Sequence, residues 1–379
     1  MSQPETLLAP GTSPIVARGI CYVLLAYEVA MSIDLDEAER RISAATERAT
    51  IRHKRRAPRY FDYDPAPLRV MQDSRPIAVG DWRTTGSVEL VIYDFGAISV
   101  GYAIPLSGSL ANLVALADAL YDNAALLADS RRRVEEFLAD VQGALTRSQI
   151  ANVVEPYSIF QIEEFATPCP PAALYTTYAH DVAQLLRSER DALSDQEVHD
   201  ATAVRIAFGP DDVAIIDWDA ALLFDREADD VRAVLEFANV ELLEMRYLDQ
   251  RLDSSLDQAY EALSRRTTRW SILPGSARAD LRRIGQLQVD AAILFEGVNN
   301  ALKLLGDQYL ARVYRLVSER FHLAEWDASI LRKLETLESI YQKMSDFAAT
   351  WRLELLEWII IALIAAEIAL SVVVPLTGR

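Results

Sequence analysis

The sequence predicts an α+β domain, followed by long packed helices and a final membrane-spanning helix. Three observations lead to this fold class. Short β-rich runs alternate with amphipathic helical stretches through roughly the first 225 residues. Beyond that point apolar residues recur in steps of four and three, the spacing of packed helices. Near the end, the nineteen residues from Trp358 to Leu376 contain one ionisable side chain, Glu367.

Composition restricts the function classes. The 379 residues are 51% hydrophobic and 25% charged, which is typical of a globular protein, and the net charge is −18. An acidic chain lacks the basic footprint of a general nucleic-acid binder, so we expect no DNA partner. Cys21 and Cys169 form no CxxC pair, and the four histidines have no metal-ligand spacing. The phosphate-binding and nucleophile motifs GxxxxGK[ST], GxGxxG and GxSxG are missing from the sequence, so we expect neither a cofactor nor an enzyme.

The N-terminal part begins with a proline-containing lead-in over residues 1–14, which we expect to be disordered. A strand is predicted from Gly19 to Met31, and Asp34 is placed to cap the helix that follows. A basic loop with aromatic residues comes next. It could bind anionic lipid or ribosomal RNA, or it could be a solvated loop that offsets the acidic surface. Its basic candidates are Arg52, Lys54, Arg55, Arg56 and Arg59.

The remainder of the α+β domain, which we place at residues 15–225, shows one pattern twice. Two strands flank a tight turn near Asp94–Gly96, and a helical stretch covers most of 110–145. The second half has strands at 157–165, 203–208 and 213–224, with a helix near 181–190 between the first two. Residues 91–100 and 214–223 share three identities, including the turn positions Asp94 and Asp217. We therefore expect two similar β-α-β-β-α halves, with internal duplication left open. The two aspartates are either an acid–base pair or ordinary turn residues.

A helical coiled-coil bundle is predicted over residues 226–357. Its helices cover about 227–265, 277–321 and 330–357, and short loops between them favour antiparallel neighbours. The third helix has an uninterrupted apolar seam from Ile330 to Trp358. Arg and Trp suit lipid headgroups, so the loop after the first helix is a candidate membrane-surface contact. The contact residues are Arg265, Arg266, Arg269 and Trp270.

The run 358–376 is long enough to cross a hydrocarbon core of about 30 Å. Ala362, Ala365 and Ala369 continue the seam, and small residues let helices pack closely in lipid. Glu367 and Ser371 are the intramembrane polar candidates. A carboxylate there costs about 2.5–3.5 kcal/mol, so we expect a partner helix, protonation or local snorkelling to accommodate Glu367. No export signal is visible, which predicts a single-pass protein of a bacterial inner membrane with its body in the cytoplasm.

Three stretches resemble a known family. They are EFANVELLEMRYLD at 236–249, NALKLLGDQYLARVY at 300–314 and WRLELLEWIIIALIAAEI at 351–368. The resemblance is to the "required for meiotic nuclear division" family, a domain of unknown function. It implies a membrane-anchored protein with a soluble N-terminal body. Its mitochondrial branch is associated with organelle translation, but the first residues are too poor in Arg for a targeting presequence, so we expect no mitochondrial address.

These observations favour a membrane-anchored scaffold or adaptor that recruits a cytosolic macromolecule. The resemblance makes the translation machinery, and with it a ribonucleoprotein such as the ribosome, the first candidate partner. The helical seam predicts a homo-oligomer. The alternative is a membrane-tethered regulatory domain in which the α+β part binds a small molecule.

Overall fold

The computed structural model describes residues 13–42, 46–48, 65–268 and 308–377, together with the single positions 285 and 289. Side chains are described throughout these ranges except at 46–48, 262–268, 347–355 and 369–377. The chain divides into two compact units. The sheet unit comprises Met1–Tyr247 and Leu294–Asp327, and the helix unit comprises Leu248–Ile293 and Ala328–Arg379.

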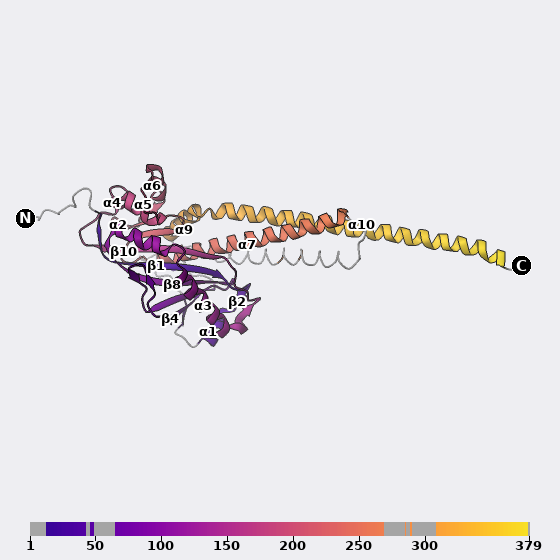
Figure 1. Ribbon diagram of the computed structural model, residues 1–379, viewed down its shortest axis with the longest axis horizontal. Helices are drawn as coiled ribbons and strands as arrows, with labels where there is room; N and C mark the ends of the chain where they lie inside the picture. Colours follow the sequence, from indigo (N-terminus) through magenta and orange to yellow (C-terminus); the bar gives the residue numbers. More distant parts are fainter. Residues whose placement is uncertain are drawn as a thin grey trace, which may run out of the picture. The chain divides into compact units, whose positions relative to one another are not determined.

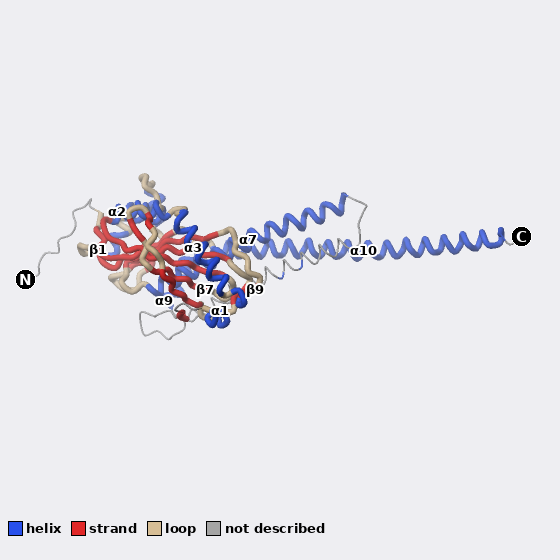
Figure 2. The backbone as a smooth tube through the Cα atoms, turned by 60° about the horizontal axis from the view of Figure 1, so that its bottom comes forward, coloured by secondary structure: helices blue, strands red, loops and turns tan. Residues whose placement is uncertain are grey.

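A nine-stranded mixed sheet forms the centre of the sheet unit (Figures 1 and 2). Its order is β11-β12-β13-β10-β1-β8-β7-β4-β3. The strands are β1 (Ile15–Glu28), β3 (Thr46–Arg48), β4 (Leu68–Asp73), β7 (Ser87–Ile92), β8 (Ala97–Ser109), β10 (Val154–Phe165), β11 (Arg205–Ile206), β12 (Val213–Ile216) and β13 (Ala220–Phe224). Two small ribbons join β2 (Ser32–Ile33) to β9 (Leu145–Thr146) and β5 (Ala78–Val79) to β6 (Trp82–Arg83).

Strand β1 lies at the middle of the sheet. It pairs antiparallel with β8 and with β10, so that Val23 lies opposite both Tyr102 and Ser158. The pairing of β10 with β13 is parallel, with Ile159 opposite Ala221, and this makes the sheet mixed. Side chains of a strand alternate between the two faces of a sheet. Along β1 almost every position is buried towards its C-terminal end, as expected for a strand covered on both faces.

Helices flank the sheet and continue beyond it. They are α1 (Leu35–Arg41), α2 (Leu110–Leu120), α3 (Ala124–Asp140), α4 (Pro171–Leu174), α5 (Ala179–Arg187), α6 (Asp195–Ala201), α7 (Asp229–Thr268), α9 (Gln308–Arg320) and α10 (Leu323–Thr377). Side-chain oxygens cap several N-termini. The predicted cap is confirmed, because Asp34 accepts a 2.9 Å hydrogen bond from the backbone N–H of Glu37.

The two faces of the sheet are covered by different helices. Face A carries Cys21, Val23, Leu25 and Tyr27 of β1, and it packs in one apolar cluster against α1 to α5. Face B carries the alternate residues. Ser99 of β8 contacts Glu236 of α7, Tyr93 packs on Phe237, and Tyr157 of β10 packs on Phe321 at the end of α9. Face B is therefore covered by the start of α7 and by α9.

Several predicted elements need correction. The single strand expected at 213–224 is a hairpin, because Asp217–Asp219 form a turn between β12 and β13. The helix expected over most of 110–145 is interrupted at Asp122, whose φ is 47°, and Asn123 caps a new helix there. The two halves are not copies of one arrangement. β8 runs antiparallel to β1, whereas β13 runs parallel to β10.

The predicted transmembrane helix is also corrected. Among the described residues, no single helix is long and apolar enough to cross a membrane. The bent pair formed by α2 and α3 is long and apolar enough only when the two helices are taken together. Leu113 and Phe137 of that pair are buried in the apolar cluster of face A.

Candidate interaction site

The most unusual exposed feature of the helix unit is the apolar segment, which we define as residues 356–368 of α10. Every side chain in it is exposed. Trp358, for example, keeps 70% of its surface accessible. The large apolar residues of the segment are Leu356, Trp358, Ile359, Ile360, Ile361, Leu363, Ile364 and Ile368. They succeed one another along the chain, so they point to all sides of the helix rather than to one face.

The earlier part of α10 packs against the second half of α7. Lys333 contacts the carboxylates of Asp249 at 2.7 Å and Asp253 at 2.6 Å. Ser329, one turn before Lys333, donates to Asp249 at 3.3 Å, so the two helices run parallel. Ile330 and Met344 are buried in this stretch, and the predicted coiled-coil seam stays a prediction. Figure 1 shows α10 continuing past the end of α7.

The predicted packing and intramembrane residues fall within or next to the apolar segment. Ala362, Ala365 and Glu367 are exposed on α10. Ala369 and Ser371 belong to the same helix, but their side chains lie outside the description. The packing role predicted for the alanines stays a prediction.

The two predicted basic sites lie largely outside the described residues. Arg265 and Arg266 are in the last turns of α7, in the stretch whose side chains are not described. Arg269 and Trp270 fall outside the described residues, as do all the basic-loop candidates, Arg52, Lys54, Arg55, Arg56 and Arg59. Both basic contacts stay predictions.

An acid–arginine cluster holds the corner between α9 and α10 to the β12–β13 turn. Asp217, which is 1% exposed, accepts hydrogen bonds from Arg187 Nε at 2.8 Å and from Arg320 Nε at 2.9 Å. Both guanidinium groups also bind Asp200, and the hydrogen bond from Arg320 is the main cause that lowers the pKa of Asp200 to about 2. Beside the cluster, Trp218 stacks on His322. Since both arginines are engaged by carboxylates, the cluster has a structural role: it links α5, α6 and the end of α9 to the β12–β13 turn.

The structure does not bring Asp94 and Asp217 together. Asp94 lies in the β7–β8 turn and Asp217 in the β12–β13 turn. In the sheet order, β13, β10, β1 and β8 separate β7 from β12. An acid–base pair of these two residues is therefore wrong. Among the described residues, no group of three or more His, Cys, Asp or Glu side chains is arranged to hold a metal ion.

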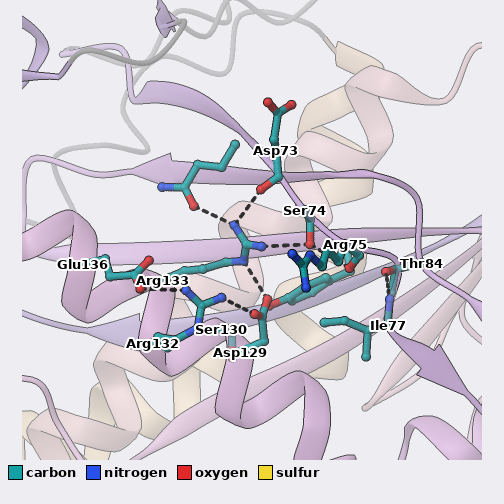
Figure 3. Close-up of polar contacts among 12 residues, drawn as sticks. Asp73, Ser74, Arg75, Ile77, Thr84, Asp129, Ser130, Arg132, Arg133 and Glu136 are labelled. Atoms are coloured by element: carbon teal, nitrogen blue, oxygen red, sulfur yellow. Dashed lines mark hydrogen bonds and ion pairs between the residues drawn. The ribbon is translucent and has the colours of Figure 1, made fainter.

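A second polar network lies under face A and centres on Arg133 of α3 (Figure 3). This side chain is almost fully buried, and its guanidinium donates to Asp129 at 2.6 Å, Gln72 at 3.0 Å and Ser74 at 2.8 Å. Tyr102 of β8 donates to the same Asp129 carboxylate at 2.9 Å. Burial alone would raise the pKa of Asp129, but hydrogen bonds from Arg133, Arg132 and Tyr102 outweigh it and lower the pKa.

A third set of buried polar groups lies on face B, along the first half of α7. Glu236, Glu241 and Glu244 are each less than 7% exposed. Ser99 donates to Glu236 at 2.7 Å, and Tyr314 of α9 donates to Glu241 at 2.7 Å. These carboxyl groups were not among the residues that the sequence suggested. Their signal is present in the stretch VLEFANVELLEM at 234–245, where apolar residues occur on all sides of the helix and leave no polar face for the acids.

Comparison with known proteins places this architecture in a family. The model of the family described as "Uncharacterized protein MJ0711, N-terminal domain" matches residues 18–230, more than half of the chain. One relative is "Uncharacterized protein MJ0711" of Methanocaldococcus jannaschii, which is 23% identical over 239 residues. That alignment covers 62% of this chain and 72% of the relative. No solved structure matches. These matches do not test the resemblance to the meiotic nuclear division family, which stays a prediction.

Proposed function

The chain belongs to the family described as the N-terminal domain of uncharacterized protein MJ0711, and we propose that it is a self-associating scaffold. In this proposal the sheet unit binds another macromolecule, and the apolar segment of α10 is the place where copies of the chain meet. The supporting observation is the exposure of every side chain from Leu356 to Ile368.

The energetic argument starts from the cost of leaving this segment in water. Burying one Leu or Ile side chain contributes about 1.5–3 kcal/mol, and eight large apolar side chains are exposed here. A helix that is apolar on all sides is normally found in the interior of an assembly. Contiguous exposed apolar surface of this kind marks an interaction site. The segment is therefore expected to be covered by another molecule.

Further copies of the same chain fit this role. The seam that begins at Ile330 continues at the same spacing through Trp358, Ala362 and Ala365, so a second copy presents a matching row. Glu357 and Glu367 are the only charged residues of the segment, so identical helices meet with little repulsion. A helix pair would cover one side of each segment. Because the apolar residues lie all round, we expect more than two copies to meet there.

Mass measurement in solution tests this proposal. Ile360 and Ile364 lie one turn apart on α10 and are both exposed. We expect the full chain to have a mass that is a multiple of 42.3 kDa by light scattering after size exclusion, and Ile360→Glu with Ile364→Glu to lower it towards one copy. Ser339→Glu with Ser345→Glu is the matched control, because it adds the same charge at exposed polar positions of the same helix.

Two outcomes would contradict self-association. One is a wild-type chain that is monomeric across the concentrations measured, and the other is an oligomer that survives the Ile360/Ile364 double substitution. If the monomeric chain sediments with phospholipid vesicles and the double variant does not, lipid rather than a second copy covers the segment.

The macromolecule bound by the sheet unit is a separate part of the proposal. The resemblance noted above makes the translation machinery the first candidate. Crosslinking of the full chain in cells, followed by identification of the captured proteins, tests this choice. Ribosomal proteins captured by the wild-type chain would support it, and their absence from the captured set would remove the translation machinery as the partner.

A further inference from the structure

The interface between α7 and face B of the sheet contains carboxyl groups where a helix–sheet interface is normally apolar. Glu241 is 4% exposed and Glu244 is 3% exposed. Apolar neighbours on the same helix, including Phe237 and Leu243, are also buried. A carboxylate removed from water is strongly destabilised unless a cation or several hydrogen bonds compensate it. The partners of these two groups therefore determine their charge state.

Glu244 faces another carboxyl group. Its partner is Glu28, at the C-terminal end of β1, and the two side chains share a hydrogen bond. Glu28 is itself 2% exposed. Two ionised carboxylates repel each other and neither can donate, so this hydrogen bond requires a proton on one of them. Burial raises the pKa of Glu244 to about 7.

Glu241 has a neutral donor and an acidic neighbour. The hydroxyl of Tyr314 in α9 donates to its Oε2 at 2.7 Å. Asp327, at the start of α10, is the other titratable group that faces Glu241, and it disfavours a negative charge there. Burial raises the pKa of Glu241 to about 8. The groups packed against Glu241 thus come from α9 and α10, and the group packed against Glu244 comes from β1.

We propose that protons on Glu241 and Glu244 hold α7 against the sheet, so that this helix loosens from face B as the pH rises through neutrality. The geometry that supports the proposal is a helix–sheet interface built around a carboxyl–carboxyl pair and a carboxyl–phenol pair. Both pairs connect α7 to other elements, namely β1 and α9. Loss of either proton leaves a negative charge in an apolar layer.

The direction of the pH effect follows from proton linkage. In an opened state the two glutamates are solvated and titrate near their ordinary pKa of about 4.3. In the docked state their pKa is raised, so the docked state binds more protons. Docking is most stable below the ordinary pKa and weakens as the pH rises towards 7 for Glu244 and 8 for Glu241. Each proton lost on opening increases the opening constant about tenfold per pH unit.

Hydrogen exchange of the full chain, followed by mass spectrometry, measures this opening segment by segment. Peptides covering 233–246 of α7 are compared with peptides covering 126–138 of α3, which packs on face A, after correction for the intrinsic pH dependence of exchange. We expect protection of the α7 peptides to fall by at least about tenfold between pH 6 and 8 while α3 protection stays constant. Equal behaviour of the two sets of peptides would overturn the proposal.

Isosteric substitutions assign the effect to the two side chains. Glu241→Gln with Glu244→Gln keeps size and hydrogen bonding but cannot ionise, so α7 protection should no longer depend on pH. Glu261→Gln, at an exposed position of α7, is the control and should keep the wild-type dependence. An unchanged pH dependence in the double variant would overturn the proposal.

The single variants provide a second test, because each should remove part of the pH dependence of α7 protection. None of these outcomes depends on self-association through α10, since the same comparison can be made in the Ile360→Glu/Ile364→Glu chain.

Discussion

The two faces of the central sheet bury polar groups in opposite ways. Under face A, the Asp129 carboxylate meets the Arg133 guanidinium and the Tyr102 hydroxyl, so that a negative charge has a positive partner. Under face B, Glu241 meets a phenol and Glu244 meets a second carboxyl group. The pKa of Asp129 is lowered, whereas the pKa values of Glu241 and Glu244 are raised. The site around Asp129 is thus stabilised by charge and the sites around Glu241 and Glu244 by protons, while elsewhere on face B Glu155 has a positive partner in Arg246.

This difference separates a permanent core from a layer whose packing can change. The helices on face A lie within the residues that match the family, 18–230. The buried acids of α7 lie beyond the end of that match. Helix α7 begins in the sheet unit and continues into the helix unit. A proton-dependent contact on face B therefore acts on a helix that belongs to both units, as α10 also does, whereas the Arg133 network lies within the residues that match the family.

The largest effect on this comparison is expected from Arg133→Met. The substitution keeps an apolar stem but leaves Asp129 without its main cation, and it removes the donors to Gln72 and Ser74. Breaking a buried ion pair by removing one partner costs about 3–5 kcal/mol. We expect a loss of that size in the free energy of unfolding, measured with urea at pH 7.

Arg132→Met is the matched control for Arg133→Met. Arg132 neighbours Arg133 in the same helix and also contacts Asp129, but its side chain is 52% exposed. An exposed ion pair contributes at most about 1 kcal/mol. If the two variants lose similar stability, the Arg133 network is not the buried charge pair on which the contrast between the faces depends.

A smaller effect is expected on face B from Tyr314→Phe. It removes the hydroxyl that donates to Glu241, and an unsatisfied buried acceptor costs about 1–3 kcal/mol. The hydrogen bond from this hydroxyl lowers the pKa of Glu241, so its loss should raise that pKa further. The fall in unfolding free energy on the alkaline side should then begin at a higher pH. Tyr260→Phe, at an exposed position of α7, should change stability by less than about 0.5 kcal/mol. Equal losses from Tyr314→Phe in the wild-type and Glu241→Gln backgrounds would show that the two side chains are not coupled.

Individual strands and helices could be predicted from the sequence because they depend on local patterns, whereas the nine-stranded mixed sheet that joins them was not predicted. The alternation of Phe160 and Ile162 with Ile159, Gln161 and Glu163 predicted a strand at 157–165, and β10 confirms it. Comparison with Asp94 marked Asp217 as a turn position. The strand prediction nevertheless ran through it, from 213 to 224. Apolar residues flank that turn on both sides, so composition alone does not show the break.

The polar networks could not be predicted, because their members are distant in the sequence. Arg133 and Gln72 are 61 residues apart, and Glu241 and Tyr314 are 73 apart. A glutamate in an amphipathic helix is normally solvated, so Glu241 and Glu244 carry no local sign of burial except the apolar residues around them. The apolar segment of α10 was found from the sequence, since its composition is continuous along the chain.

The smallest effect is expected at the acid end of the pH scale, where face A should respond in the direction opposite to face B. Burial and hydrogen bonding act against each other on Asp129, and the hydrogen bonds prevail to leave the pKa lowered in the folded chain. An ionised Asp129 therefore stabilises the fold above its ordinary pKa of about 3.9, and this contribution is lost as the pH falls through the lower, folded value.

Asp129→Asn removes the titration while keeping a similar size. The difference in unfolding free energy between wild type and Asp129→Asn should be largest near pH 6 and should shrink steadily on acidification to pH 2.5. Asp140→Asn, at an exposed position at the end of α3, is the control and should change the unfolding free energy only slightly. A difference for Asp129→Asn that stays constant with pH would mean that the charge on Asp129 does not stabilise face A, and the contrast between a charge-stabilised and a proton-stabilised face would fail on this side.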